Sequence, residues 1–248
     1  MDVMESINKA CEMLQNENYE DNFRAADYLE KIADDLIEAG ELDLNILRLA
    51  VQGRSICTYP YEHLLSHADD VSLARTFIDK VDKALYHLDM IESQFLDLSE
   101  EDLNLFADLR GRFYEFKGIY LYKLGDTSCA YPLSMARGFG SNRAKLYLAF
   151  HKNDTVEDKD EKFYSEEVNL LESYISNYSS VGEGSIEPAT AYEWLANYYE
   201  HGVGAEQDSA KAEAYREMHD KLIANVEEEQ MKSWNELCQL APWVAEAN

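Results

Sequence analysis

Gly202-Val203-Gly204 is the stretch of this chain whose residue types come closest to a ligand-binding loop. Glycines at this spacing open the loops that cradle the phosphates of dinucleotides, where a third glycine follows three residues after the second. Gln207 occupies that third position here, and the residues before Gly202 follow a helical pattern instead of the strand that precedes such loops. The stretch therefore favours a turn between two helices, in which Gly202 adopts a positive φ.

Two histidines are a second candidate for chemistry. His63 and His67 are four residues apart and would share one face of a helix, with Asp69 and Asp70 close behind them. A zinc site needs a third and a fourth ligand, and the chain has no H-E-x-x-H pattern. We therefore predict two ordinary surface or half-buried histidines and no metal site.

The other reactive residue types are scattered. The acidic run at 153–161 is not expected to bind calcium, because a loop that starts at Asp158 places Phe163 where an EF-hand needs glycine. No P-loop, G-x-S-x-G or C-x-x-C pattern occurs. We predict no catalytic residue, no cofactor and a protein that is not an enzyme. Free thiols in a reducing compartment are expected at Cys11, Cys57, Cys129 and Cys238.

The net charge excludes one large class of partners. The 248 residues contain 22 Lys and Arg against 49 Asp and Glu, a formal net charge of −27 at pH 7. A field of that sign repels phosphate backbones and anionic lipid headgroups, so we expect neither ordinary nucleic-acid binding nor membrane binding. Two interpretations stay open: the charge keeps the protein dispersed in solution, or it steers a basic protein or peptide partner.

We expect no targeting or membrane-spanning segment. The opening MDVMESINKACEML lacks the basic and apolar regions of a signal peptide. No apolar run approaches the length of about 18 residues that a transmembrane helix needs. We expect a soluble, cytoplasmic protein.

Apolar residues recur at helical spacing along nearly the whole chain. Only 4 prolines and 11 glycines interrupt it, which favours long helices, and no segment shows the period-2 alternation of a strand. Ser99 is expected to cap one helix, and Gly125 to end it in the left-handed conformation. The expected helices of this all-α fold span residues 4–14, 25–37, 42–56, 71–95, 99–124, 129–137, 142–150, 163–178 and 188–201 and continue from 208, with 226–243 as a separate C-terminal cap.

One short pattern occurs twice. The pattern D-x-x-R-A-x-x-Y-x-E from Asp21 to Glu30 returns as D-x-x-K-A-x-x-Y-x-E from Asp208 to Glu217. The two copies start 187 residues apart, which corresponds to about five units of ~37 residues, a length typical of helical repeats. The alanine allows two helix backbones to approach, and the aspartate is suited to cap the helix that carries it.

Residues 189–220 resemble a Sel1-like repeat, which is a relative of the tetratricopeptide repeat. The match consists of A-x-x-x-L-A-x-x-Y-x-x-G-x-G from Ala191 to Gly204 and D-x-x-K-A-x-x-Y from Asp208 to Tyr215. Ala196 and Ala205 stand where the family usually has glycine and valine. The positions expected to build the repeat are Gly125, Leu195, Tyr199, Gly202, Gly204, Asp208, Ala212 and Tyr215.

Other parts of the chain resemble the family less closely. Residues 21–38 resemble the second helix of a unit and residues 112–138 a tetratricopeptide-like unit, whereas residues 40–110 match poorly. The resemblance implies a right-handed α/α superhelix, a solenoid of antiparallel helical hairpins. Its expected divisions within a single domain over 1–248 are a first hairpin at 1–40, atypical long helices at 41–110 and repeats with a C-terminal cap at 111–248.

The resemblance also implies a binding function. In tetratricopeptide-like units one stripe of the first helix lines a concave groove, here an acidic one, that receives a protein or peptide partner. A scaffold or adaptor is therefore the leading hypothesis, and the alternative is an inhibitor or immunity-type protein that neutralises a basic partner, such as a nuclease, by acidic mimicry. The stripe would contain Arg112, Glu115, Ile119, Tyr122, Lys123, Arg143, Leu146, Phe150, Asn153, Thr190, Glu193, Asn197, Glu200 and His201.

Overall fold

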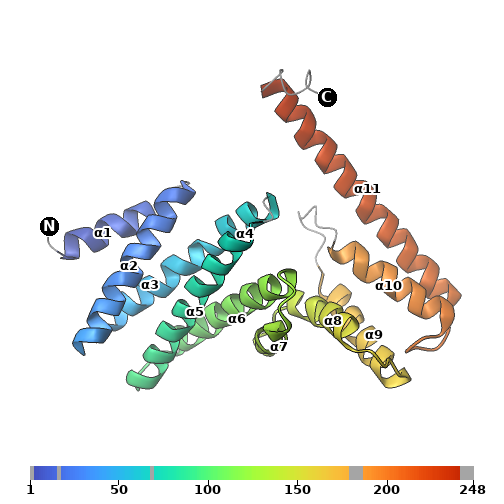
Figure 1. Ribbon diagram of the computed structural model, residues 1–248, viewed down its shortest axis with the longest axis horizontal. Coiled ribbons are helices and arrows are strands. Elements are labelled where there is room, and N and C mark those ends of the chain that lie inside the picture. The colour runs from blue at the N-terminus through green and yellow to red at the C-terminus, as the bar shows by residue number, and fades with distance from the viewer. Residues whose placement is uncertain (1–2, 16–17, 68–69, 179–186, 241–248) are drawn as a thin grey trace. The chain divides into compact units, whose positions relative to one another are not determined.

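The structure is a computed structural model that describes residues 3–15, 18–67, 70–178 and 187–240, and every regular element in these residues is a helix (Figure 1). The all-α prediction is therefore confirmed for this part of the chain, and none of its helices is long and apolar enough to span a membrane. In chain order the elements are α1 (Val3–Met13), α2 (Tyr19–Ala39), α3 (Leu44–Ile56), α4 (Thr58–His67), α5 (Val71–Gln94), α6 (Glu100–Lys123), the 3-10 helix η1 (Thr127–Cys129), α7 (Ala130–Gly138), α8 (Arg143–Thr155), α9 (Glu161–Ser176), α10 (Glu187–His201) and α11 (Ser209–Leu240).

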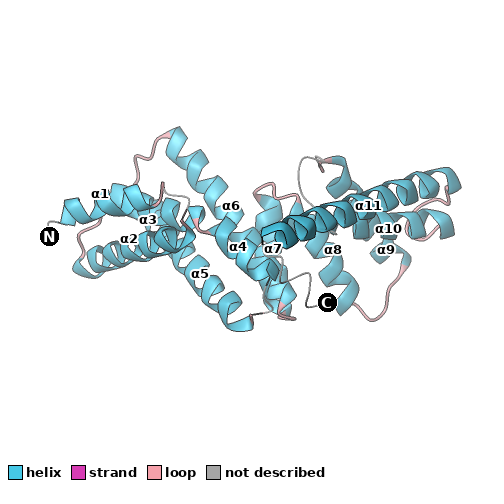
Figure 2. Ribbon diagram, turned by 90° about the horizontal axis from the view of Figure 1, so that it is seen from above, coloured by secondary structure: helices cyan, strands magenta, loops and turns pink. Residues whose placement is uncertain are grey.

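The helices belong to two compact units, Met1–Tyr147 and Leu148–Asn248. Within each unit, most packing is between helices that follow one another in the chain, such as α2 with α3, α6 with α7, and α10 with α11. Figure 2 shows the same elements from above, as helices joined by loops. A solenoid of repeated hairpins and the divisions at residues 40 and 110 stay predictions.

α5 supplies much of the core of the first unit. The ring of Phe77 lies 4.6 Å from Tyr61 of α4, 5.7 Å from Phe116 and 5.6 Å from Tyr120 of α6, measured between centroids. The contacts with Phe116 and Tyr120 are edge-on, an arrangement that stabilises a core beyond the apolar area that it buries. Along α5 the side chains of Phe77, Val81, Leu85, Leu88 and Ile91 are buried, and Leu73 is half-buried.

The same unit contains a buried ion-pair cluster between α2, α3 and α5. The guanidinium of Arg54, which is almost fully buried, donates to Glu30 at 2.8 Å and to Asp27 at 2.5 Å. Lys80 of α5 lies 2.8 Å from Asp27. A buried charge is tolerated only when it is paired and hydrogen-bonded, so these contacts hold the three helices in one arrangement.

Two helices of the first unit approach closely at Gly118. A Cβ atom at this position of α6 would lie 2.6 Å from the side chain of Leu133 in α7, closer than real Cβ contacts. Leu133 itself is fully buried. Glycine is therefore required here by the packing of α6 against α7.

The two predicted ends of α6, at Ser99 and Gly125, are confirmed. The backbone N–H of Asp102 donates to the hydroxyl of Ser99 at 3.1 Å, and that hydroxyl donates to the carboxylate of Asp102 at 2.7 Å. Gly125 follows α6 with a φ of 71°, and its N–H donates to the carbonyl of Tyr122. Both ends satisfy backbone groups that a helix leaves without partners.

One helix is missing from the predicted set, and one predicted boundary is wrong. The helix predicted over 42–56 corresponds to α3, but the unpredicted α4 follows it at once. Pro60 lies in the first turn of α4, where the missing N–H would have no partner inside the helix. Residues 226–240 continue α11 without a break, since no glycine or proline interrupts them. The last three residues of the expected C-terminal cap, 241–243, lie outside the described residues.

Candidate partner-binding surface

The glycine pair after α10 forms a turn whose backbone groups bond within the protein. The N–H of Val203 donates to the carbonyl of Tyr198, and the N–H of Asp208 donates to the carbonyl of Tyr199, both at 2.9 Å. A phosphate-binding loop needs such N–H groups free for its ligand. The positive φ values of 65° at Gly202 and 69° at Gly204 confirm the turn.

Gly204 also permits close contact between the turn and α9. A Cβ atom on it would lie 2.5 Å from the carbonyl oxygen of Tyr164 in α9. Asp208 caps α11 as expected, because its carboxylate accepts from the N–H of Lys211 at 3.0 Å. Of the other positions expected to build the repeat in the second unit, Leu195, Tyr199 and Ala212 are buried and Tyr215 is half-buried.

A polar cluster joins α9, α10 and α11 beside this turn. The carboxylate of Glu172 accepts from Lys211 at 2.5 Å and from the hydroxyl of Tyr199 at 2.7 Å, with Tyr215 at 3.3 Å. Burial disfavours the charged form of Glu172, but the hydrogen bonds from Lys211 and Tyr199 outweigh it and lower the pKa of the carboxyl. The Lys211 ammonium also lies 4.0 Å from the centroid of the Tyr199 ring. These contacts fasten α10 and α11 to α9.

A second carboxyl of the same unit is completely buried. Glu167 of α9 is 0% exposed and accepts a hydrogen bond from the hydroxyl of Tyr198 in α10. Burial raises the pKa of Glu167, and the bond from Tyr198 only partly opposes this. Sequence reasoning missed both Glu167 and Glu172, because nothing local distinguishes them among 49 acidic residues.

In the first unit, the structure brings three residues of the predicted stripe into one region. Arg143, at the start of α8, donates to Glu62 of α4 at 2.7 Å and reaches Glu115 of α6 at 3.5 Å. Glu115 also accepts from the hydroxyl of Ser141 at 2.6 Å. Arg112 of α6 donates to Ser55 at the end of α3 at 3.3 Å. The polar groups of four helices are thus held in fixed positions.

Two large exposed side chains lie close in the chain to residues of this polar region. Ile56 follows Ser55 directly and is 44% exposed, and Tyr59, one helical turn before Glu62, is 68% exposed. Tyrosine is a residue type that interfaces favour as an anchor. The α4–α6 surface is defined here by the residues Ile56, Tyr59, Glu62, Arg112, Glu115 and Arg143.

Two residues predicted to line a groove do not do so. Ile119 is 1% exposed and Leu146 is fully buried, both within the core of the first unit. The prediction is wrong at these positions because a helical stripe that could line a groove has the same spacing as one that faces a core. Tyr122 is half-buried, with its ring 5.5 Å from that of Tyr147.

Apart from Lys123, which is exposed at the end of α6 in the first unit, the rest of the stripe lies in the second unit. Phe150 of α8 packs its ring 5.1 Å from Trp194 of α10, and Asn153 accepts a hydrogen bond from Lys159. Glu200 is ion-paired with Arg216 of α11. Thr190 is half-buried, and the exposed residues on α10 are Glu193, Asn197 and His201. A partner-binding role for any of them stays a prediction.

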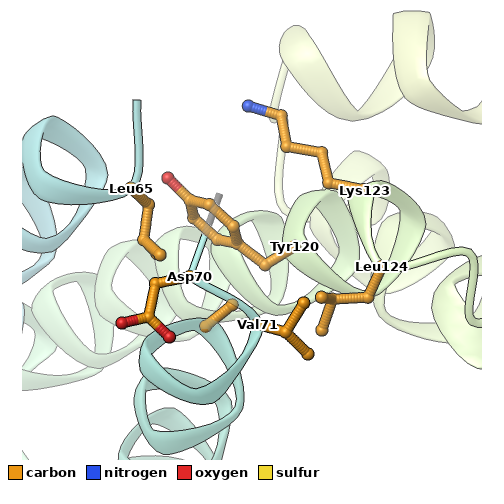
Figure 3. Close-up of a pocket in the computed structure, with 7 residues that line it drawn as sticks. Leu65, Asp70, Val71, Tyr120, Lys123 and Leu124 are labelled. Carbon is orange, nitrogen blue, oxygen red and sulfur yellow. The ribbon is translucent and has the colours of Figure 1, made fainter. Parts of the chain in front are cut away.

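An open cavity of about 300 Å³ lies between the end of α4, the start of α5 and the end of α6 (Figure 3). The side chain of Tyr120 lies between Leu65 and Lys123 in this view, and Asp70 stands at another edge. The cavity is lined by Leu65, Asp70, Val71, Ala74, Tyr120, Lys123 and Leu124.

The described residues contain no group of three or more His, Cys, Asp or Glu side chains placed to hold a metal ion. Of the predicted histidine pair, the side chains of His63 and His67 lie outside the described residues, as does Asp69. Cys57 is buried, and burial raises the pKa of its thiol to about 12, so the thiol stays protonated and is a poor nucleophile.

Comparison with known proteins finds no family model, no curated protein and no solved structure that matches this chain.

Proposed function

We propose that this chain is a non-enzymatic helical-repeat protein that binds a protein or peptide partner as a scaffold or adaptor, and that its Sel1-like segment is one unit of an α/α solenoid. The observation that carries the proposal is the α4–α6 surface. There, ion-paired side chains from α4, α6 and α8 adjoin two exposed apolar anchors, Ile56 and Tyr59.

The make-up of this surface suits a protein partner. Side chains that are already fixed by hydrogen bonds lose little conformational entropy when a partner binds, so Glu62, Glu115 and Arg143 are preorganised. Tyr59 has only two side-chain torsions and a polar tip, which lets it contact apolar and polar groups alike. An exposed tyrosine beside a satisfied polar network resembles the anchor-and-rim arrangement of protein interfaces.

Charge selects the kind of partner. The net charge of −27 accelerates the approach of a basic protein or peptide and repels an acidic one. The same charge supports a second candidate function, in which the chain neutralises a basic partner such as a nuclease. An inhibition assay separates the two, because a scaffold leaves its partner's activity intact and an inhibitor abolishes it.

The proposal is tested by selecting short random peptides on the wild-type protein. Selected peptides are expected to carry net positive charge, because the chain is strongly acidic. Their affinity is expected to fall about tenfold when Tyr59→Ser removes the anchor. It is also expected to fall as the salt concentration rises from about 0.05 M to about 0.3 M, because screening weakens the attraction.

Tyr86→Ser is the matched control, because Tyr86 of α5 is also an exposed tyrosine, at 47%, but lies outside the α4–α6 surface. Peptide affinity is expected to be the same for this variant and for wild type. A selection that yields no peptide, or peptides that bind the Tyr59 and Tyr86 variants equally well, would contradict the proposal.

A further inference from the structure

The cavity between α4, α5 and α6 has an apolar lining and an exposed edge. Val71, the first residue of α5, is 54% exposed, whereas Ala74 and Tyr120 are buried. Protein interiors normally fill such spaces with side chains, and exposed apolar hollows mark places where a partner or ligand binds. A volume of about 300 Å³ is at the lower end of the range of ligand pockets. It therefore fits a single side chain better than a cofactor.

Two opposite charges border the cavity without neutralising each other. Asp70 uses one carboxylate oxygen to cap α5, by accepting from the N–H of Leu73 at 3.0 Å. Lys123 lies 5.4 Å from the centroid of the Tyr120 ring. Among the ion pairs of the described residues, none joins Asp70 to Lys123 or joins either of them to a third residue. Because no carboxylate among the described residues pairs with it, the Lys123 ammonium, which lies over the Tyr120 ring, can pair with an incoming acidic group at this cavity.

We infer that this cavity is the anchor site for a peptide segment in which one apolar side chain has a basic residue on one side and an acidic residue on the other. The apolar side chain fills the space between Leu65, Val71 and Tyr120. The basic residue faces Asp70 and the acidic residue faces Lys123. This inference rests on the proposed function and adds to it the sequence character of the bound segment.

The position of the cavity links it to the α4–α6 surface. Leu65 follows Glu62 of that surface by three residues on α4, and Lys123 follows Arg112 by eleven residues, or about three turns, on α6. Residues three or four apart and eleven apart share one side of a helix. A single peptide can therefore contact Tyr59 and reach the cavity along the same two helices.

The test uses two labelled peptides that each contain one leucine. In the first peptide a lysine lies two residues before the leucine and a glutamate two residues after it, and in the second peptide these two residues are exchanged. In an extended peptide, residues two apart point to the same side. Both peptides carry the same additional lysines, and binding is followed by NMR titration of the full-length protein. One order is expected to bind about tenfold more tightly than its counterpart with serine in place of leucine. Val71→Trp, which fills the mouth of the cavity at an exposed position, is expected to abolish this difference.

The charge variants assign the two ends of the peptide. Lys123→Gln is expected to remove the preference for glutamate in the peptide. Asp70→Asn retains a residue that caps helices and is expected to remove the preference for lysine. Lys31→Gln, at an exposed lysine of α2, is the control and is expected to leave both preferences intact.

Each outcome bears on one claim. Affinities that ignore the leucine, or that are unchanged in both charge variants, would overturn the inference. Binding of free leucine with the same dependence on Asp70 and Lys123 would also overturn it, because the ligand would then be a metabolite. If peptides still bind in a Tyr59-dependent way while ignoring the cavity, the proposed function stands and only this inference fails.

Discussion

Replacing Gly204 with alanine is expected to weaken the second unit far more than the same change two residues earlier at Gly202. Both glycines have similar positive φ values, 65° and 69°. The left-handed conformation costs an alanine about 1–2 kcal/mol in the folded state. Replacing glycine also lowers the conformational entropy of the unfolded chain, which stabilises the fold by about 0.4–1 kcal/mol, so the net loss in the free energy of unfolding is about 1 kcal/mol at either site.

The surroundings separate the two positions. A Cβ atom at Gly202 would lie 3.3 Å from the Cβ of Gln207, which is an exposed side chain in a loop. A Cβ atom at Gly204 would lie 2.5 Å from the carbonyl oxygen of Tyr164, so the turn and α9 must move apart. Overpacking of this kind costs about 1–3 kcal/mol more. The expected losses are therefore about 1 kcal/mol for Gly202→Ala and about 2–4 kcal/mol for Gly204→Ala.

Urea unfolding followed by tryptophan fluorescence measures these losses. All three tryptophans, at positions 194, 234 and 243, belong to the second unit, so the signal reports its unfolding. The midpoint is expected to fall slightly for Gly202→Ala and at least twice as far for Gly204→Ala. Equal shifts, or a Gly204→Ala protein as stable as wild type, would refute the reasoning that Gly204 is required by its contact with α9.

Three further changes probe the packing. Glu167→Gln is expected to flatten the pH dependence of the urea midpoint. Because the pKa of buried Glu167 is raised, the folded state keeps this proton to a higher pH than the unfolded state does, and wild-type stability falls as the pH rises above the ordinary carboxyl range. The variant has no such proton and is expected to lack this fall. Lys211→Met is expected to cost about 1 kcal/mol in the same assay, since its bond to Glu172 is partly exposed, and a double-mutant cycle with Glu172→Gln measures that bond. Gly118→Ala is expected to lower stability by about 1–3 kcal/mol in thermal unfolding monitored by circular dichroism, because its Cβ would meet Leu133.

Local features of the fold could be predicted from the sequence. The turn at Gly202 and Gly204 and the caps at Ser99 and Asp208 depend on residues within a few positions of one another, and the structure confirms them. α4 was missed because a proline such as Pro60 favours the end of a helix when only the sequence is considered. A proline in the first turn of a helix nevertheless leaves the hydrogen bonds of that helix intact.

Contacts between distant residues could not be predicted in the same way. Arg143 and Glu62 are 81 residues apart in the chain, and Lys211 and Glu172 are 39 apart. Many acidic residues could have served as partners, so the pairs emerge only from the packing of the helices. The burial of Ile119 and Leu146 has the same cause, since the side of a helix that faces the core depends on its neighbours.

Hydrogen exchange, measured by mass spectrometry on the protein with and without a selected basic peptide, tests the central claim most directly. The account predicts that bound peptide slows amide exchange around residues 55–62, 112–115 and 141–143, the segments that build the α4–α6 surface. Protection confined to other segments would contradict it, because the peptide would then bind a different part of the protein.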